Sequence, residues 1–332
     1  MKSRIILFIS GLSCSVLFLM NIDLCKQLFL DGFSICAGGL VPSMLPLIIA
    51  SNIILASIND LPANVKVYIV YVLGLIFGFP IGVKFASEML ASREINSIAY
   101  KKLVCCGGVP SIGFVIGVCG KHFGIEKGLV LYVITILSAF FCSLIFGSNE
   151  TFKKDNTEQR EIKKCSFFVV ISESVKDGIM RIINICGYVI FFYAFSGIIC
   201  REITNPYAVA IISGFLEFST GCTHAVSLGN DISYVLCAAI LSFSGISVFM
   251  QCTNIEKVYG AKILKSEYLL SRALQAALSS IIAYCVLLGD KIIIPILVLL
   301  TVIHFLTPFL QRVHKNKLNQ PGKRSIISNQ KT

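Results

Sequence analysis

Long apolar stretches separated by short polar gaps make up most of this chain. Several of them come close to the roughly 18 to 20 residues that a helix needs to cross the hydrocarbon core of a bilayer. Pro42 and Pro46 lie inside one such stretch, where proline is expected to kink or break the helix. We predict eight full membrane-spanning helices, at about residues 5–22, 33–57, 103–119, 128–147, 179–200, 233–250, 268–289 and 292–310.

Two further apolar segments, 67–84 and 207–225, are interrupted by glycine, proline or charge. The first closes on Lys84, and the second carries Glu217 in its middle. Broken helices are tolerated at membrane depth only where they are buried in protein or line a cavity, and a pair of them in corresponding positions is typical of a transport site. We therefore predict two re-entrant hairpins. The stretch 84–102 carries too many charges to be buried and is predicted to be exposed and amphipathic.

A weak internal repeat of about 115 residues divides the chain into two halves. Its landmarks recur at similar offsets: Asp31 with Asp177, Gly32 with Gly178, Gly78 with Gly214, and Pro110 with Gly245. We predict an N-terminal signal-anchor helix (1–30), a first gate-like repeat (31–147), a cytoplasmic linker and entry segment (148–176), a second, inverted repeat (177–290), and a last membrane helix with a basic tail (291–332). The predicted fold class is an all-α polytopic membrane protein.

The distribution of positive charge fixes a predicted orientation. The formal net charge is +11, and 55% of the residues are hydrophobic, which is typical of a membrane protein rather than a nucleic-acid-binding protein. Stretches that we assign to the cytoplasm hold 21 Lys and Arg, whereas the assigned outer loops hold five. This asymmetry follows the positive-inside rule and predicts a multi-pass protein with both termini in the cytoplasm and with mutually inverted halves.

Cysteine and histidine usage suggests neither a disulfide framework nor a metal centre. The fourteen cysteines are scattered, mostly inside apolar runs, and none forms a C-x-x-C pair. Such cysteines are typically small buried hydrophobes. The histidines are isolated: His122, His224, His304 and His314. We predict no metal site and no cofactor.

Glu217 is the strongest candidate for a functional residue. A carboxylate at membrane depth costs a few kcal/mol, so it tends to face a cavity and to mark a solute or ion pathway. It is expected to bind a coupling ion, a proton or a polar group of the substrate; the alternative is a structural pair with a neighbouring helix. Ser219 and Thr220 are expected to donate hydrogen bonds to substrate, although such hydroxyls as often bond their own backbone.

The other candidates lie on the remaining broken segments. The hairpin tip at Gly78, Pro80 and Gly82 is expected to expose backbone amides to an anion, unless it forms a simple proline kink. Lys84 is expected to serve as a counter-charge for an anionic substrate, or to extend to the cytoplasmic interface. The remaining candidates for substrate binding flank a predicted break in a span: Ser244, Ser247 and Gln251.

Three stretches resemble the signature motifs of the sporulation integral membrane proteins of endospore formers: 78–84, 214–221, and 243–248 followed by Gln251. This family belongs to the nucleoside-recognition gate group, whose architecture is similar to that of concentrative nucleoside transporters. The chain departs from the family at Cys105 to Gly108, where the family usually places asparagines. The resemblance implies a stage V sporulation role in which dipicolinic acid is moved across the outer forespore membrane.

From these observations we expect a transporter of a small polar or anionic solute, located in the cell membrane or the outer forespore membrane. Its partners are expected to be the lipid bilayer and a dicarboxylate or nucleoside-like solute, with homo-oligomerisation possible. The alternatives are a nucleoside-type transporter or a non-transporting gate or scaffold subunit. An enzyme is not expected, because apart from Glu217 the spans offer no suitable pair of nucleophile and base.

Overall fold

The computed structural model describes residues 2–58, 61–106, 108–146, 166–262 and 265–289. Within these ranges the regular structure is entirely helical. Five segments are long and apolar enough to cross a membrane: Ile22–Ser57, Ile125–Cys142, Phe167–Ile199, Asp231–Tyr259 and Lys265–Leu287. The predicted linker at 148–165, the span at 292–310 and the basic tail lie outside the described residues. The described part of Met1–Tyr284 forms one compact unit.

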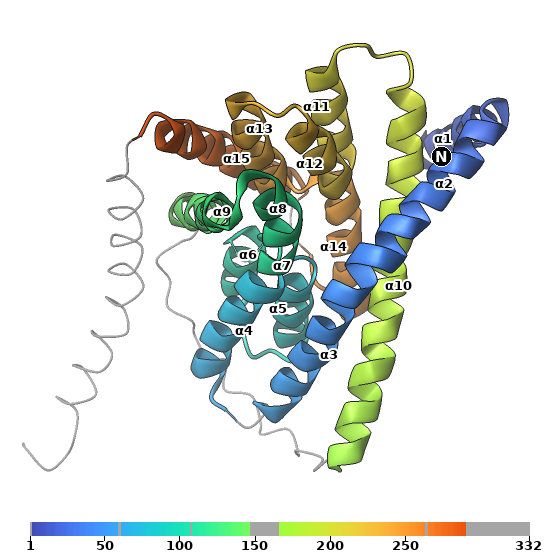
Figure 1. Cartoon of the computed structure of the whole chain (residues 1–332). Coiled ribbons are helices and arrows are strands. Elements are labelled where there is room, and N and C mark those ends of the chain that lie inside the picture. The colour runs from blue at the N-terminus through green and yellow to red at the C-terminus, as the bar shows by residue number, and fades with distance from the viewer. Residues whose placement is uncertain (1, 59–60, 107, 147–165, 263–264, 290–332) are drawn as a thin grey trace, which may run out of the picture. The chain divides into compact units, whose positions relative to one another are not determined.

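The first half contains these elements: α1 (Lys2–Met20), α2 (Ile22–Ile35), the π-helical segment η1 (Cys36–Leu40), α3 (Val41–Ser57), α4 (Ala63–Phe77), α5 (Ile81–Ala91), α6 (Ser97–Cys106), α7 (Ile112–Phe114), η2 (Val115–Gly120), α8 (Lys121–Phe123) and α9 (Ile125–Phe146). The second half contains α10 (Phe167–Ile199), α11 (Pro206–Leu216), α12 (Phe218–Ser227), α13 (Asp231–Phe243), α14 (Gly245–Tyr259) and α15 (Lys265–Leu287). Figure 1 shows the course of these helices.

The run from α2 to α3 stays helical through both prolines. Pro42 occupies the first turn of α3, directly after the π-helical turn η1, and Pro46 lies inside the same helix. Proline lacks the amide that would continue the hydrogen-bond ladder, and the π-helical turn directly before Pro42 accommodates this locally altered pattern. The helix is therefore not broken at either proline, and a kink, the other expected outcome, stays a prediction.

The long helix α10 packs along both α2 and α3 (Figure 1). Small residues bring the backbones together: Gly32 lies against Ile190, and Gly178 lies against Ile49. Between them, the Cys36 thiol faces the Cys186 carbonyl at 3.9 Å. Close approach at glycine is how helices associate in lipid, where the hydrophobic effect gives no attraction between them.

The second hairpin reverses direction at Glu217. Gly214 in α11 and Gly221 in α12 are in backbone contact, so that a Cβ atom on Gly221 would collide with the Gly214 backbone. In an unbroken helix seven residues would span about 10 Å, so this contact requires the chain to fold back. Asn205 caps the start of α11, where its side chain accepts a hydrogen bond from the Tyr207 amide at 2.9 Å.

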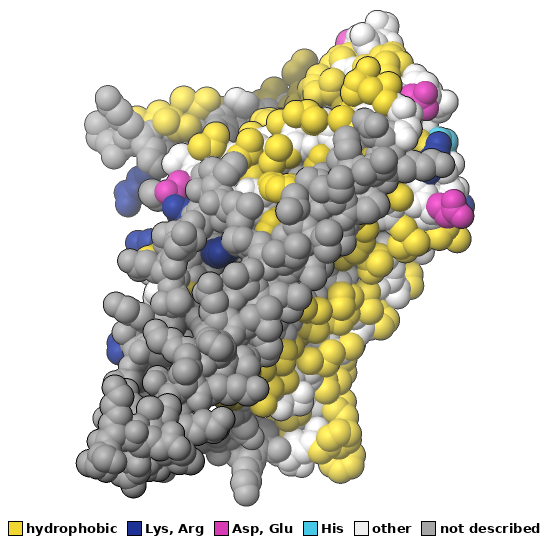
Figure 2. Space-filling view, turned by 90° about the vertical axis from the view of Figure 1, so that its left-hand side faces the viewer, with side chains coloured by type: hydrophobic (Ala, Val, Ile, Leu, Met, Phe, Trp, Pro, Cys, Tyr) yellow, Lys and Arg dark blue, Asp and Glu magenta, His cyan; other side chains and the backbone are white. Residues whose placement is uncertain are grey.

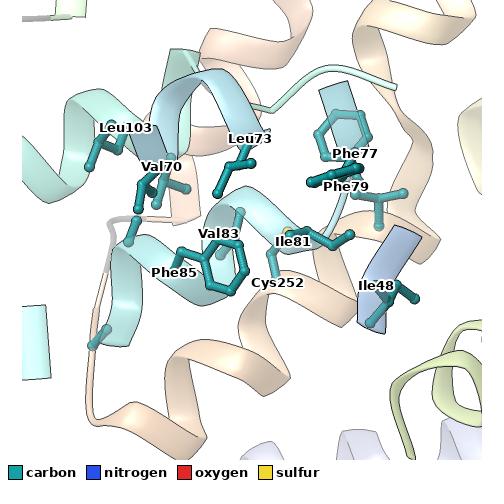
Figure 3. Close-up of a cluster of buried hydrophobic side chains, with 14 of the residues drawn as sticks. Ile48, Val70, Leu73, Phe77, Phe79, Ile81, Val83, Phe85, Leu103 and Cys252 are labelled. Atoms are coloured by element: carbon teal, nitrogen blue, oxygen red, sulfur yellow. The ribbon is translucent and has the colours of Figure 1, made fainter. Parts of the chain in front are cut away.

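The first hairpin is formed by α4 and α5, which pack on each other around a tip at Gly78 to Pro80. Figure 3 shows the apolar side chains between them, with Cys252 beside Ile81 and with Leu103 and Ile48 at opposite ends of the cluster.

Burial of α5 corrects one prediction. Most of this helix is buried, including Lys84, Phe85 and Met89, whereas the stretch 84–102 was predicted to be exposed. The physical reason is that Lys84 has a charged partner in another helix, while Glu88 on the same helix points to the exposed side.

Two of the predicted spans are interrupted. The predicted span 103–119 divides into α6 and the helical run Ile112–Phe123, with non-helical backbone at 108–111. Ser111 caps the second part by accepting a hydrogen bond from the Phe114 amide at 3.2 Å. The predicted span 233–250 breaks at Ser244, which has a left-handed backbone with φ of 75°. This second break was predicted from the sequence, whereas the first was not.

The outer surface of the described residues is strongly apolar. In the space-filling view, most of the surface that is not grey is hydrophobic, and charged side chains are few and lie mostly toward the edges (Figure 2). Exposed large hydrophobic residues are frequent on the long helices, among them Phe168, Met180 and Ile183. Large contiguous apolar surfaces mark contact with a membrane or a protein. This surface is consistent with a membrane protein.

Replacing Gly221 with alanine is expected to lower the free energy of unfolding by roughly 1–3 kcal/mol, because the new methyl group would push α12 away from α11. Gly187→Ala in α10 is the matched control, since no atom lies within 4 Å of its added Cβ. It should gain roughly 0.5–1 kcal/mol from helix propensity. The free energies of unfolding of both variants are measured with the purified proteins in mixed micelles. A gain in stability for Gly221→Ala as well would contradict the close hairpin contact.

Candidate functional site

The four interruptions of the helices meet at one place in the unit. Gly78 is so close to Ser111 that a Cβ atom would collide with its backbone, and the Phe79 amide donates to the Val109 carbonyl at 3.1 Å. On the other half, a Cβ atom on Gly245 would lie 3.1 Å from the Leu216 carbonyl. Each broken hairpin therefore touches the broken span of its own half.

The two hairpin tips also meet each other through aromatic rings. Phe218, the first residue of α12, lies with its ring centroid 6.5 Å from Phe79 and 4.8 Å from Phe114. The rings of the first half thus cover the start of the helix that follows Glu217. Side chains from both halves enclose one small space.

Glu217 occupies the turn between α11 and α12 and is completely buried. Its Oε2 atom accepts hydrogen bonds from the Thr220 amide at 2.8 Å, from the Thr220 hydroxyl at 3.0 Å and from the Ser219 hydroxyl. These bonds cap α12, where the positive end of the helix dipole favours a carboxylate. The other oxygen, Oε1, has no hydrogen-bond partner among the described residues.

The carboxylate borders a central cavity of about 20 Å³. Glu217, Ser219 and Gln251 supply polar groups at its wall, together with Ser111 from the first half. A cavity must offer at least about 10–15 Å³ to hold one water molecule, so this one has room for a water or a small cation but not for an organic solute. An unpaired buried carboxylate oxygen beside such a space is a binding group without a protein partner.

Two larger pockets lie on either side of the central cavity along α10. The first, which we call the Arg181 pocket, has a volume of about 210 Å³ and shares Ile185 and Gln251 with the cavity. The second, which we call the Thr223 pocket, is also about 210 Å³ and shares Val189 and Ser219 with it. The three spaces thus form a series.

Their order can be read along the helix axis. The Arg181 pocket begins at Asp177, the cavity contacts Ile185 and Val189, and the Thr223 pocket reaches Tyr193. At 1.5 Å per residue, the distance from Asp177 to Tyr193 is roughly 24 Å, close to the ~30 Å thickness of a hydrocarbon core. Together the residues that line the three spaces cover roughly 24 Å of α10.

The structure brings some of the predicted site residues together. Glu217, Ser219 and Gln251 border the central cavity, while Thr220 borders the Thr223 pocket and Pro80 the Arg181 pocket.

Other predicted residues shape the backbone around the site and do not line the three spaces. Gly78 allows the tip to contact Ser111, and Ser244 provides the left-handed turn before α14. Ser247 accepts a hydrogen bond from the Gln251 amide group at 3.3 Å. Gly82 lies in the first turn of α5, away from the walls of the three spaces.

Lys84 lies in an ion-pair cluster rather than at the central cavity. Its ammonium group donates to Asp177 at 2.7 Å and to the Asn52 side-chain oxygen at 2.8 Å. Arg181 bonds the same carboxylate oxygen at 3.3 Å. The cluster connects α5 of the first half to α10 of the second at the wall of the Arg181 pocket.

A double-mutant cycle on Lys84 and Asp177 is expected to give a coupling of about 1–2 kcal/mol. Breaking a fully buried pair costs about 3–5 kcal/mol, and the value is lower here because 48% of the Asp177 side chain is exposed. Lys101 and Glu267, paired at 2.7 Å with both side chains 31% exposed, are the control and should couple by at most about 1 kcal/mol. Unfolding of the alanine variants measures both cycles. Equal coupling in the two pairs would show that Lys84 is solvated.

Arg272 is a buried charge that was not among the predicted residues. Its guanidinium donates to the carbonyls of Val104 at 3.1 Å, Cys105 at 2.9 Å and Gly108, at the end of α6. It also lies over the ring of Phe79, with its central carbon 5.3 Å from the ring centroid. The available signal was a lone arginine inside the predicted span 268–289.

No protein-family model matches this chain, and no curated protein and no solved structure matches it significantly. The resemblance to sporulation membrane proteins stays a prediction. The geometry of the site is therefore the basis for assigning a function.

Proposed function

We propose that this protein is a membrane transporter that moves a small polar or anionic solute past Glu217. One observation carries the proposal: a fully buried carboxylate with an unpaired oxygen borders a small cavity that lies between two larger pockets. Intramembrane ionisable groups that face a cavity mark solute or ion pathways. Interrupted helices from two halves that meet at one site are typical of secondary transporters.

The proposed inverted repeat is supported by reciprocal contacts. The offset of 146 residues between the halves pairs Gly32 with Gly178, and it pairs Leu45 with a position one residue from Ile190. Gly32 contacts Ile190, and in the equivalent way Gly178 contacts Leu45. The hairpins show the same reciprocity. The second helix of each hairpin packs on the element that follows the break in the other half: α5 packs on α14, and α12 packs on η2. Contacts of this reciprocal kind are expected for two halves related by a twofold axis.

Transport would alternate between the two pockets. The central cavity of about 20 Å³ is too small for an organic solute, so one hairpin must move away from its neighbours before solute enters. Movement of the α5 tip would open the cavity toward the Arg181 pocket, and movement of the α12 tip would open it toward the Thr223 pocket. Such rigid rocking of one repeat against the other is the usual basis of alternating access.

The Arg181 pocket has the chemistry for an anion with an aromatic or amide character. Its wall combines the Arg181 guanidinium, which also bonds the Asp177 carboxylate at the same wall, with the side chains of Asn184, Asn254 and Tyr188. A guanidinium has five N–H donors and can bind a second carboxylate beside the first, and amides supply further donors. Dipicolinic acid, the substrate suggested by the sequence resemblance, suits this pocket. Glu217 would then hold the proton or cation that offsets the negative charge of the solute.

Uptake by proteoliposomes tests the proposal. The purified protein, reconstituted alone, should accumulate labelled dipicolinate faster than empty liposomes, and faster than it accumulates uridine. Uptake of uridine alone would favour a nucleoside-type transporter. Absence of flux for both solutes would contradict transport by the isolated chain and favour a gate or scaffold subunit of a larger complex.

A further inference from the structure

Three cysteine thiols from both halves of the chain converge beside the hairpin of Glu217. Cys119 lies in η2, Cys222 in α12 and Cys237 in α13. Their Sγ atoms all lie within 4.8 Å of one another, and each residue is completely buried. Among the described residues this is the one group of three or more Cys, His, Asp or Glu side chains close enough to share a metal ion.

We propose that these thiols form a binding site for a soft monovalent cation, Cu(I). Thiolate ligands favour soft metals such as Cu(I). Metal–sulfur bonds of about 2.3 Å place three sulfur atoms of a planar site about 4 Å apart, so small side-chain adjustments would close the present separation. Each thiol that binds as thiolate releases one proton to solvent, and copper keeps its oxidation state throughout.

The number of ligands distinguishes Cu(I) from Zn²⁺. A structural zinc site is almost always four-coordinate, and the group has three members within the part of the chain that is described. The sulfur atoms are also shielded from water, which would otherwise supply a fourth ligand. A trigonal, all-sulfur site fits Cu(I) better.

The three thiols lie close to the wall of the Thr223 pocket. Val118 and Thr223, the sequence neighbours of Cys119 and Cys222, both line that pocket. The cation would thus bridge η2 of the first half to α12 of the second at the wall of one pocket. If the proposed transport cycle holds, occupancy would keep this side closed. That consequence rests on the proposed function, whereas binding itself does not.

Competition with the Cu(I) chelator bathocuproine disulfonate tests the site. The reduced full-length protein in detergent, kept free of oxygen, should take one equivalent of Cu(I) from the chelator. Cys119→Ser, Cys222→Ser and Cys237→Ser should each weaken binding by about 100-fold or more, since even loss of a group outside the ligand set costs 10–100-fold. Cys142→Ser is the buried control, because its thiol faces the Ser271 carbonyl instead.

Two further measurements identify the ligands without relying on any single variant. X-ray absorption should show copper bound by three sulfur atoms. In mild denaturant, where local opening exposes buried thiols, Cu(I) should slow the alkylation of Cys119, Cys222 and Cys237, as read by mass spectrometry, while the half-exposed Cys25 reacts equally with and without Cu(I). Binding that survives all three serine variants, nitrogen or oxygen ligation, or a disulfide within the trio would overturn the proposal.

Discussion

Replacing Glu217 with glutamine is expected to reduce solute flux to the level of empty liposomes while leaving the protein folded. Glutamine keeps the shape, and its carbonyl can still accept bonds from the Thr220 amide and hydroxyl. What changes is the other end of the side chain, where an amide donor replaces the unpaired Oε1 acceptor. Loss of one hydrogen bond to a charged group, worth about 1.5–3 kcal/mol, corresponds to a roughly 10- to 150-fold loss of binding.

The measurement is uptake of dipicolinate by reconstituted protein, with equal incorporation checked by gel. Glu173→Gln is the matched control, because Glu173 is an exposed acid on α10. Its flux should equal that of wild type. If Glu217→Gln transports normally, the carboxylate serves only as the cap of α12 and solute takes another route.

Replacing Arg272 with methionine is expected to lower the free energy of unfolding by about 3–5 kcal/mol, the largest effect on stability that we predict, because each buried carbonyl left without a donor costs about 1–3 kcal/mol. Arg272 is 1% exposed, and its guanidinium supplies donors to three carbonyls at the end of α6 and beyond it. Without it these carbonyls lose a buried partner. The cation also opposes the negative end of the α6 dipole.

Arg272→Lys should recover little of this loss. An ammonium group is a single point of charge and cannot reach the carbonyls of both Val104 and Gly108 as a planar guanidinium does. Arg201→Met is the control, because the Arg201 side chain is 58% exposed, and its effect should stay within about 0.5 kcal/mol. Unfolding in mixed micelles compares the three variants. A lysine variant as stable as wild type would show that the positive charge alone stabilises the end of α6 and that the several guanidinium hydrogen bonds are not needed.

Local pattern was enough to locate several of the long apolar helices and three of the four breaks, at Gly78, Glu217 and Ser244. Apolar run length identified α9 and α15 within about three residues at each end, whereas α10 begins at Phe167, well before the predicted span 179–200. A lone acid between two glycines identified Glu217, because a charge inside an apolar run is costly in lipid and therefore rare. These features depend on residues adjacent in the chain, so the sequence shows them directly.

Partners that are distant in the chain could not be predicted in this way. The partner of Lys84 is Asp177, 93 residues later, and without that pairing the stretch after the first hairpin seemed too charged to be buried. The gathering of Cys119, Cys222 and Cys237 likewise depends on how three elements pack. Only the fold decides which buried polar groups meet.

The packing of α10 against α2 and α3 bears on the origin of the chain. Gly32 and Gly178 occupy equivalent places in the same contact, each receiving a branched side chain from the opposite helix. An isologous contact of this kind requires a single self-complementary surface. If the two halves are the inverted repeat proposed above, a half-length ancestor that entered the membrane in both orientations would already have possessed that surface. Fusion of two gene copies would then have linked two halves that already formed a dimer.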